Sequence, residues 1–294
     1  MPLSARSTSE MRVPERGVEM ATIRSLTAAV TSHPEENGAR SLVERTLRVI
    51  GTFRERRVRQ TLSEIARRAD LNVATTFRIV GKLTAWGALE RDEEGLYCIG
   101  LRLWEIASLA PRATRLEHIS RPFIHDLYSV TNCSIHLAVR DENECVFIDR
   151  LHNPDQGHMR TRVGGRYPLH ATAVGLVLLA NAPEDVIEDI FAEGLAAYTD
   201  NTVTDPGELR RKLAEVRRTN VAIQDRTMNP NVRSIAAPIS GPDGTVIAAI
   251  SINARPSDYN DRSAAHIVRL SAASISRAIA TASAAAPAAA AAAS

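Results

Sequence analysis

The sequence is poor in residues and segments that mark several large classes of protein. Its three cysteines, Cys98, Cys133 and Cys145, lie far apart and form no CxxC pair, which argues against both disulfides and a structural zinc site. The longest apolar run, residues 172–182, is far shorter than the roughly 20 residues of a membrane-spanning helix. The first residues lack the apolar core of a signal peptide, so we expect a cytoplasmic protein without a membrane partner.

Motifs of catalysis and cofactor binding are missing as well. No GxSxG, P-loop, GxGxxG or HExxH sequence occurs, and the histidines do not have a spacing typical of metal ligands. An enzyme with Ser234 or Cys133 as its nucleophile is one alternative, but the sequence identifies no base for either residue. We therefore expect neither catalytic activity nor a cofactor or metal.

Positive charge is present, but it is local. The whole chain has a net charge of only +2, whereas residues 41–104 contain 12 Lys or Arg and 8 Asp or Glu, a net charge of +4. Such a concentration favours contact with phosphate groups, and the cluster RERRVRQ at 54–60 contributes most of it. The sequence DEEG at 92–95 is acidic and should be repelled by phosphate.

The same region carries the local signals of three helices and a hairpin. Apolar residues follow Ser41 at helical spacing, Thr61 and Glu64 match a capping box, and Asn72 is a natural N-cap for the next helix. The segment ALERDEEGLYCIG at 88–100 predicts a β-hairpin. Two short helices joined by a brief turn and followed by a hairpin predict a winged helix-turn-helix over residues 41–100.

The helix after Asn72 is the expected recognition helix. Its predicted buried face comprises Val73, Phe77, Val80 and Leu83. The predicted outer face carries Thr75, Arg78 and Lys82, with Thr76 and Ile79 alongside. Arg can read guanine, Thr can contact base edges, and Lys can neutralise phosphate. An ordinary solvated helix is the alternative. The residues that we expect to contact DNA are Thr61, Ser63, Asn72, Thr75, Thr76, Arg78, Lys82 and Arg91.

The rest of the chain divides into a linker, a second domain and two tails. We expect a linker helix over 101–114, whose apolar residues exceed what one exposed helix needs; either a partner protomer or the chain's own domain would cover them. Strand-like segments at 134–140, 145–150, 233–240 and 245–254 predict a mainly antiparallel α+β sheet over 115–282. Helices are expected at 171–180, 183–192, 205–219 and 258–281. Residues 1–40 and 283–294 are expected to be disordered tails.

Several segments, in their order along the chain, resemble the IclR-type family of bacterial transcriptional regulators. They include TLSEIARRADLNVATTFRIVGKL, PLHATAVG, and IAAP followed by DGTVIAAIS. The resemblance implies an α+β protein with an N-terminal winged helix-turn-helix, a linker helix and a GAF-like or profilin-like effector-binding domain. It also implies dimers or dimers of dimers on a palindromic DNA operator, controlled by a small metabolite, commonly an organic or aromatic acid.

The resemblance also implies an effector site. The backbone N–H groups near Ala173 and Val174 would bind an anionic ligand, as helix N-termini do. The residues expected opposite them are Gln224 or Asp225, together with Ser234, Ser251 and Asn253. The alternative is that Ser251 and Asn253 only satisfy buried backbone groups. Two other functions compete: a DNA-binding protein without a ligand, and an enzyme or ligand-sensing domain without sequence-specific DNA binding.

Overall fold

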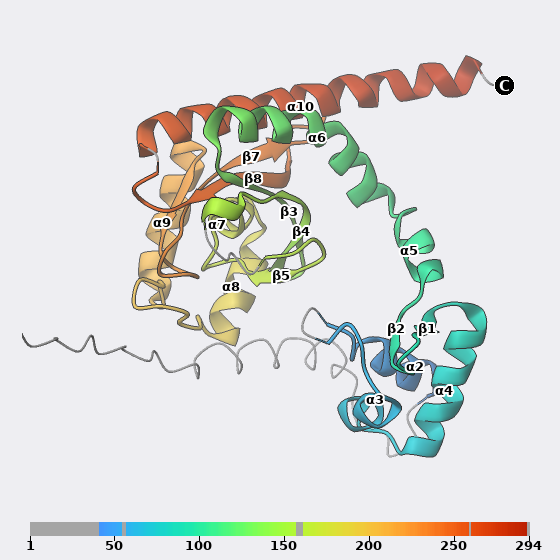
Figure 1. Cartoon of the computed structure of the whole chain (residues 1–294). Coiled ribbons are helices and arrows are strands. Elements are labelled where there is room, and N and C mark those ends of the chain that lie inside the picture. Colours follow the sequence, from blue (N-terminus) through green and yellow to red (C-terminus); the bar gives the residue numbers. More distant parts are fainter. Residues whose placement is uncertain (1–40, 55–56, 157–160, 259, 293–294) are drawn as a thin grey trace, which may run out of the picture.

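The computed structural model describes residues 41–54, 57–156, 161–258 and 260–292. The chain folds into a small N-terminal body and a larger C-terminal body, joined by α5 and the start of α6 (Figure 1). The tail expected at residues 1–40 lies outside the described residues. Within the described part, no helix has both the length and the hydropathy to cross a membrane.

The N-terminal body is the predicted winged helix-turn-helix. Its elements are α2 (Leu42–Ile50), α3 (Leu62–Ala69), α4 (Val73–Trp86), β1 (Leu89–Arg91) and β2 (Tyr97–Ile99). Each helix begins at its predicted cap, and the Thr61–Glu64 capping box is complete. Caps of this kind satisfy N–H groups that have no partner in the first helical turn. The core comprises Val49, Ile65, Ala69, Ile79, Val80 and Leu89.

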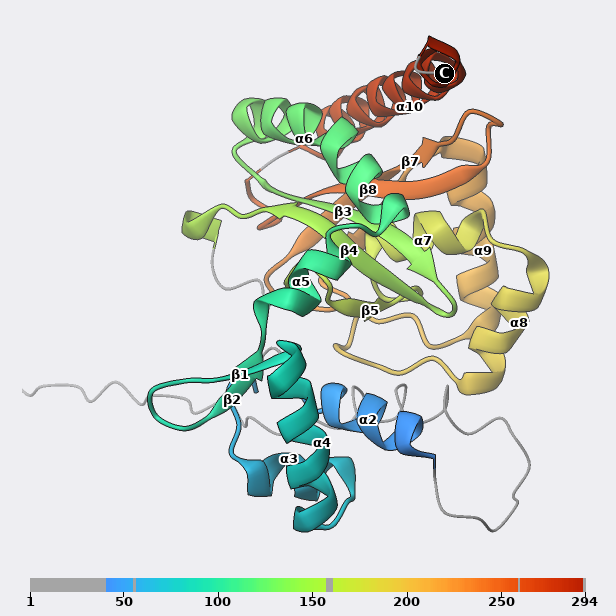
Figure 2. The ribbon, with the colours of Figure 1, turned by 90° about the vertical axis from the view of Figure 1, so that its right-hand side faces the viewer.

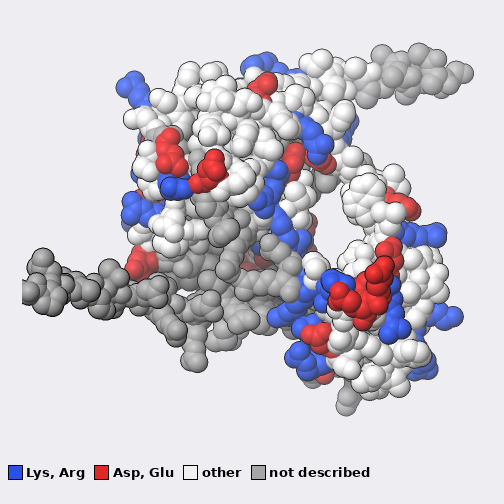
Figure 3. Space-filling view, viewed as in Figure 1, with Lys and Arg blue, Asp and Glu red and all other residues white. Residues whose placement is uncertain are grey.

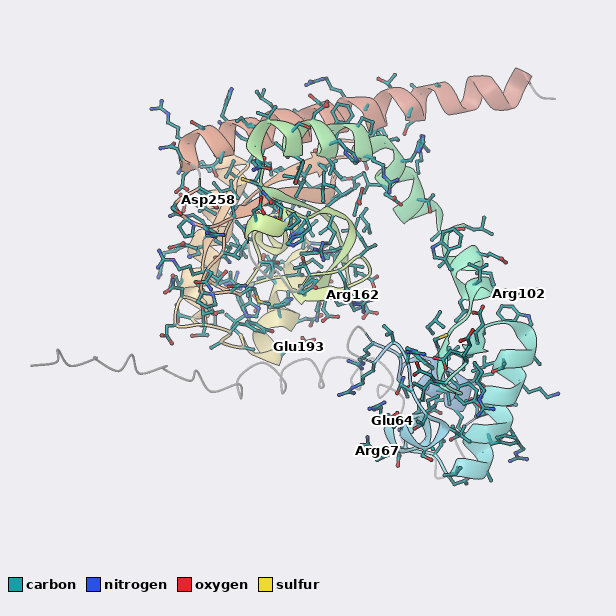
Figure 4. The ribbon with its side chains drawn as sticks, viewed as in Figure 1. Glu64, Arg67, Arg102, Arg162, Glu193 and Asp258 are labelled. Carbon is teal, nitrogen blue, oxygen red and sulfur yellow. The ribbon has the colours of Figure 1, made fainter. Side chains whose placement is uncertain are left out.

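Helix α5 (Leu101–Ala107) is fixed to this body at its first turn. The Leu101 N–H donates to the Glu90 Oε1 at 2.8 Å. Arg102, labelled in Figure 4, follows at the start of α5, and its guanidinium lies over the Trp86 ring, 4.6 Å from the ring centroid. Gly100 permits a close approach, because a Cβ there would lie 2.2 Å from the Gly87 carbonyl oxygen. The start of the linker is therefore part of the winged helix-turn-helix body.

The linker is two helices, whereas the sequence predicted one helix over 101–114. Helix α5 ends at Ala107, and α6 (Pro111–Thr131) begins after a break at 108–110. Proline disfavours the helical conformation in the residue before it. Ala110 accordingly has an extended backbone, with ψ at 103°. Pro111 is thus the physical cause of the break.

The C-terminal body contains a six-stranded antiparallel sheet in the order β5-β4-β3-β8-β7-β6. The strands are β3 (Ser134–Asp141), β4 (Glu144–Leu151), β5 (Arg166–Pro168), β6 (Ala222–Asp225), β7 (Arg233–Ser240) and β8 (Val246–Ala254). The sequence predicted the four long strands and the antiparallel α+β class. It missed β5 and β6, because three or four residues are too few to show a period of two.

Helices cover both faces of this sheet (Figure 2). Helices α6 and α10 (Asp261–Ala292) pack on one face, where the core includes Ile124, Ile250 and Val268. Helices α7 (Ala173–Ala180), α8 (Glu184–Glu193) and α9 (Pro206–Thr219) lie over the other. All eight residues of α7 are buried, so this helix is the centre of the second core.

Helix α10 continues through Pro287 to Ala292, where the sequence predicted a disordered tail from 283. A proline inside a helix removes one hydrogen bond, but alanine is the best helix former and surrounds this proline on both sides. A short 3-10 helix at Pro154–Gln156 completes the elements of the described residues.

Candidate nucleic-acid interface and ligand site

Helix α4 exposes one face to solvent, and the structure corrects which face it is. Val73 and Phe77, expected inside, are 53% and 61% exposed. Thr75 and Thr76, expected to contact bases, are buried with Ile79 and Val80. The helix is thus rotated relative to the prediction, and neither threonine side chain is available to DNA.

A local hydrogen bond explains why Thr76 can be buried. The Thr76 hydroxyl donates to the Asn72 carbonyl oxygen at 3.0 Å, four residues back in the chain. This local bond satisfies the only polar group of the side chain, so that burying its methyl group is inexpensive. Arg78 and Lys82 keep their predicted place on the exposed face.

Other residues expected to contact DNA have structural partners of their own. Thr61 and Asn72 accept hydrogen bonds from backbone N–H groups as caps, while Ser63 is exposed on the first turn of α3. Arg91 is exposed but lies against its own hairpin, with its Nε donating to the Gly95 carbonyl oxygen at 2.9 Å and its guanidinium over Tyr97. Arg78 and Lys82 are therefore the clearest candidates.

The acidic hairpin tip pairs with part of the basic cluster. Asp92 and Glu94 lie 2.5 Å and 3.4 Å from the Arg59 guanidinium. In Figure 3 acidic side chains gather over this hairpin, with Lys and Arg around them. Arg59 is consequently engaged within the protein, and the tip of the wing carries a local excess of negative charge.

The ligand site predicted in the C-terminal body is a row of polar residues on one face of the sheet. Cross-strand partners share a face, and the pairing runs Ser134–Asn253–Ser234–Gln224 across four strands. His136 and Ser251 pair in the adjacent row. The structure therefore brings Gln224, Ser234, Ser251 and Asn253 together as expected, on the face that α7 covers.

The amide groups at this site are only partly satisfied. The Asn253 Nδ2 donates to the Ser251 Oγ at 2.9 Å and to the Ser134 carbonyl oxygen at 3.2 Å. The Gln224 Nε2 donates to the His170 carbonyl oxygen at 2.9 Å. The Gln224 side chain is only 2% exposed, yet its Oε1 has no hydrogen-bond partner among the described residues. A buried acceptor without a partner is costly, so a ligand donor there would be favourable.

Helix α7 begins next to these residues. Thr172 caps the helix by accepting from the Gly175 N–H at 3.1 Å. The N–H groups of Ala173 and Val174 have no hydrogen-bond partner among the described residues. The 170–172 turn is tied to β6 and to the residues after it, because Gln224 and Thr227 donate to the carbonyl oxygens of His170 and Ala171. Two backbone N–H groups without a partner, those of Ala173 and Val174, therefore lie near the Gln224 side chain, whose Oε1 also has no partner among the described residues.

Asp225 does not belong to this group. It alternates with Gln224 and points to the opposite face, where it lies 3.6 Å from the Arg233 guanidinium. Arg233 in turn lies 3.2 Å from Asp261 on α10. Of the two alternatives left open by the sequence, Gln224 faces the predicted site.

Aromatic residues that the sequence did not predict border the polar rows. The His136 ring lies 4.7 Å from Phe147, which in turn lies 4.5 Å from Tyr167. The His136 Nε2 is 3.1 Å from the Thr161 hydroxyl. The only signal in the sequence is that His136 alternates with Ser134 on a strand, and the strand pairing that places it cannot be read from that alternation.

Burial, together with charge repulsion from Arg150 and His152, lowers the pKa of His136 from 6.5 to about 3. Because this histidine is neutral when folded, the unfolded chain binds one more proton between pH 6.5 and pH 3. The free energy of unfolding should therefore fall with decreasing pH in this window, by up to about 1.4 kcal/mol per pH unit from this residue.

Denaturation in urea at pH 7.5, 6 and 5 measures that slope, and His136→Gln should make it shallower. An equal slope in His136→Gln and the wild type would show that His136 is not the group that titrates.

The enzyme alternative gains no support from the geometry. Ser234 and Cys133 lie on opposite faces of the sheet, Cys133 being packed in the core under α6 and α10. The Cys133 thiol donates to the Thr131 carbonyl oxygen. Among the described residues, no group of three or more His, Cys, Asp or Glu could hold a metal ion.

Two family models match the chain, and together they cover both bodies. The model for the IclR helix-turn-helix domain matches residues 42–93, and the model for the C-terminal domain of bacterial transcriptional regulator IclR matches residues 110–277. Among curated relatives, the transcriptional repressor AllR of Klebsiella pneumoniae is 29% identical over 249 residues, covering 83% of this chain and 91% of that protein. The regulator BhcR of Paracoccus denitrificans is 30% identical over 195 residues, covering 66% and 70% of the two chains.

Solved structures agree with the family models. An IclR homologue from Microbacterium hydrocarbonoxydans, complexed with 4-hydroxybenzoate, is 34% identical and superposes with a TM-score of 0.78 over 81% of this chain and 99% of that one. IclR of Thermotoga maritima shares the fold at 23% identity, with a TM-score of 0.67 over 81% and 98% of the chains. The chain therefore belongs to the IclR family of bacterial regulators, which combine a helix-turn-helix with a C-terminal effector domain.

Proposed function

We propose that this protein binds a palindromic operator through α4 and that a small organic or aromatic acid, bound between α7 and the sheet, changes its affinity for that operator. The observation that carries the proposal is the unsatisfied buried Gln224 Oε1 beside the free N–H groups of Ala173 and Val174. A carboxylate would accept from these N–H groups, and a hydroxyl on the same ligand would donate to Gln224.

An aromatic acid suits the surroundings of these groups. The rings of His136, Phe147 and Tyr167 form a stack along the neighbouring strands. Planar ligands pack well against such rings in offset or tilted arrangements. The Microbacterium hydrocarbonoxydans structure contains 4-hydroxybenzoate, an aromatic acid that also carries a hydroxyl group.

Exposed apolar side chains on α2 and α5 support assembly into a homodimer or a dimer of dimers. They are Leu42, Val43 and Leu47 on α2 and Leu101, Trp104 and Ile106 on α5; Leu109, in the break after α5, is exposed as well. Within the described residues, both bodies leave these side chains exposed, which favours cover by a partner protomer over packing within one chain. A second protomer would cover them, and its two-fold symmetry would give a palindromic operator. We place this regulator in the cytoplasm with its DNA.

The test is selection of a duplex from a randomised pool, followed by titration of that duplex with and without 4-hydroxybenzoate. We expect the acid to change the dissociation constant for DNA by roughly 5- to 150-fold, the usual range of allosteric coupling. 4-Hydroxybenzyl alcohol, which lacks the carboxylate, should have no such effect. Failure to select any sequence would refute operator binding, and an unchanged affinity with a panel of organic acids would refute the effector.

A further inference from the structure

An apolar row on the exposed face of α4 is not explained by the folded chain. Val73, Phe77, Gly81 and Ala85 follow one another at intervals of four residues, and all four are exposed. The adjacent row contains Ala74, Arg78, Lys82 and Trp86, also exposed. The face therefore combines six apolar or small residues with two cations, Arg78 and Lys82, at its centre.

Phe77 is the largest apolar side chain of this row, and nothing in the described residues covers it. At 61% exposure its ring lies largely in water within a contiguous exposed apolar row, and such patches mark interaction surfaces. It lies in the first two turns of the helix, where a recognition helix contacts base edges. Its neighbour Arg78 supplies the positive charge that attracts the DNA.

Gly81 is the second unusual residue of the row. Glycine is the least favourable residue after proline in a helix interior. The fold does not require it, because a Cβ at Gly81 would meet no atom within 4 Å. Because glycine has no side chain and the space beside Gly81 is empty, another molecule can approach the helix backbone closely at this position.

We infer that Val73, Phe77 and Gly81 face the floor of the major groove, where Phe77 contacts the 5-methyl group of a thymine. The inference rests on the proposed binding of α4 to DNA. Thymine is the only base that presents a methyl group in the major groove, and phenylalanine is among the side chains that contact it. Gly81 lets the helix lie close enough for this contact, while Arg78 and Lys82 bind the adjacent guanine edge or phosphates.

The experiment uses the full-length protein and the duplex that it selects from a randomised pool. Each thymine of that duplex is replaced in turn by deoxyuridine, which removes only the methyl group. Wild-type protein should lose about fourfold in affinity at the contacted thymine, the value expected for one buried methyl group. Phe77→Ala should bind the thymine and uracil duplexes equally. Lys82→Ala is the matched control: it should bind both more weakly and keep their ratio.

Gly81→Ala provides a second test, whose expected result differs from that of a misfolded variant. Its melting temperature should rise, because alanine favours the helix, while its affinity for the selected duplex falls by about tenfold, the cost of one disturbed base-pair contact. Stability and binding would thus change in opposite directions.

Three outcomes would overturn this inference alone. Uracil tolerated at every thymine by the wild type would refute thymine contact while leaving operator binding intact. Dissociation of the oligomer in Phe77→Ala, measured by sedimentation, would show that a second copy covers the ring. Unchanged DNA affinity in Gly81→Ala would show that the helix makes no close approach there. A protein that selects no sequence refutes both this inference and the proposed function.

Discussion

Replacing Arg78 with alanine should weaken binding to the selected operator by about 1–3 kcal/mol, or roughly 5- to 150-fold. Arg78 is exposed on the second turn of α4, where its guanidinium can donate two hydrogen bonds to one guanine. The loss should be specific to one base position, because the variant keeps the rest of the recognition helix. Fluorescence anisotropy with the operator and its single-base variants measures both effects.

Lys82→Ala separates base contact from charge. A lysine that binds phosphate contributes equally to every sequence, so its removal should weaken operator and scrambled DNA alike and lower the salt dependence by about one counterion. Arg78→Ala should instead bind all bases equally at its position. Unchanged discrimination between the operator and scrambled DNA in Arg78→Ala would contradict the assignment of this face of α4.

Replacing Ser251 and Asn253 together with alanine should abolish the response to the effector. The Asn253 amide and the Ser251 hydroxyl form one hydrogen-bonded pair on the face of the sheet that α7 covers. Without them, the acid-dependent change in operator affinity, about 5- to 150-fold in the wild type, should fall below about twofold. The affinity for DNA without effector should stay at its wild-type value, because the site is remote from α4.

Asp225→Asn is the matched control for this double variant. Its side chain occupies the same region of β6 and β7 but the opposite face, beside Arg233. It should respond to the effector like the wild type. A melting curve for each variant checks the alternative that Ser251 and Asn253 only satisfy buried backbone groups: that role predicts lower stability with a normal response.

The helices of the DNA-binding body could be predicted because their N-cap residues can be recognised in the sequence. Ser41, Thr61 and Asn72 each satisfy a backbone N–H in the first turn, and such signals are local. The rotation of α4 could not be predicted in the same way. A periodic pattern gives the spacing of an apolar face, but Val73 and Phe77 repeat with the same spacing as the core residues. Burial of Thr76 depends on its bond to Asn72, which the pattern does not express.

The residues of the ligand site differ in how far the sequence can place them. Alternation along β8 is enough to put Ser251 and Asn253 on one face of the sheet. The choice between Gln224 and Asp225 needs the pairing of β6 with β7, because a shift of one residue exchanges the two faces. His136 was missed for the same reason, since its place opposite Ser251 depends on the pairing of β3 with β8.

The attachment of α5 has a consequence for how a chemical signal could reach the operator. Contacts of Glu90, Gly100 and Arg102 hold the first turn of the linker against the winged helix-turn-helix body, so we expect α5 to move together with that body. The first break in helical structure toward the effector domain is at residues 108–110, before Pro111. Effector binding would then leave the winged helix-turn-helix body unchanged in shape. It would alter only the orientation of that body relative to the effector domain, by a bend at residues 108–110. In a dimer, that orientation would set the distance between the two winged helix-turn-helix bodies, and therefore the half-site spacing of the operators that the dimer can bind.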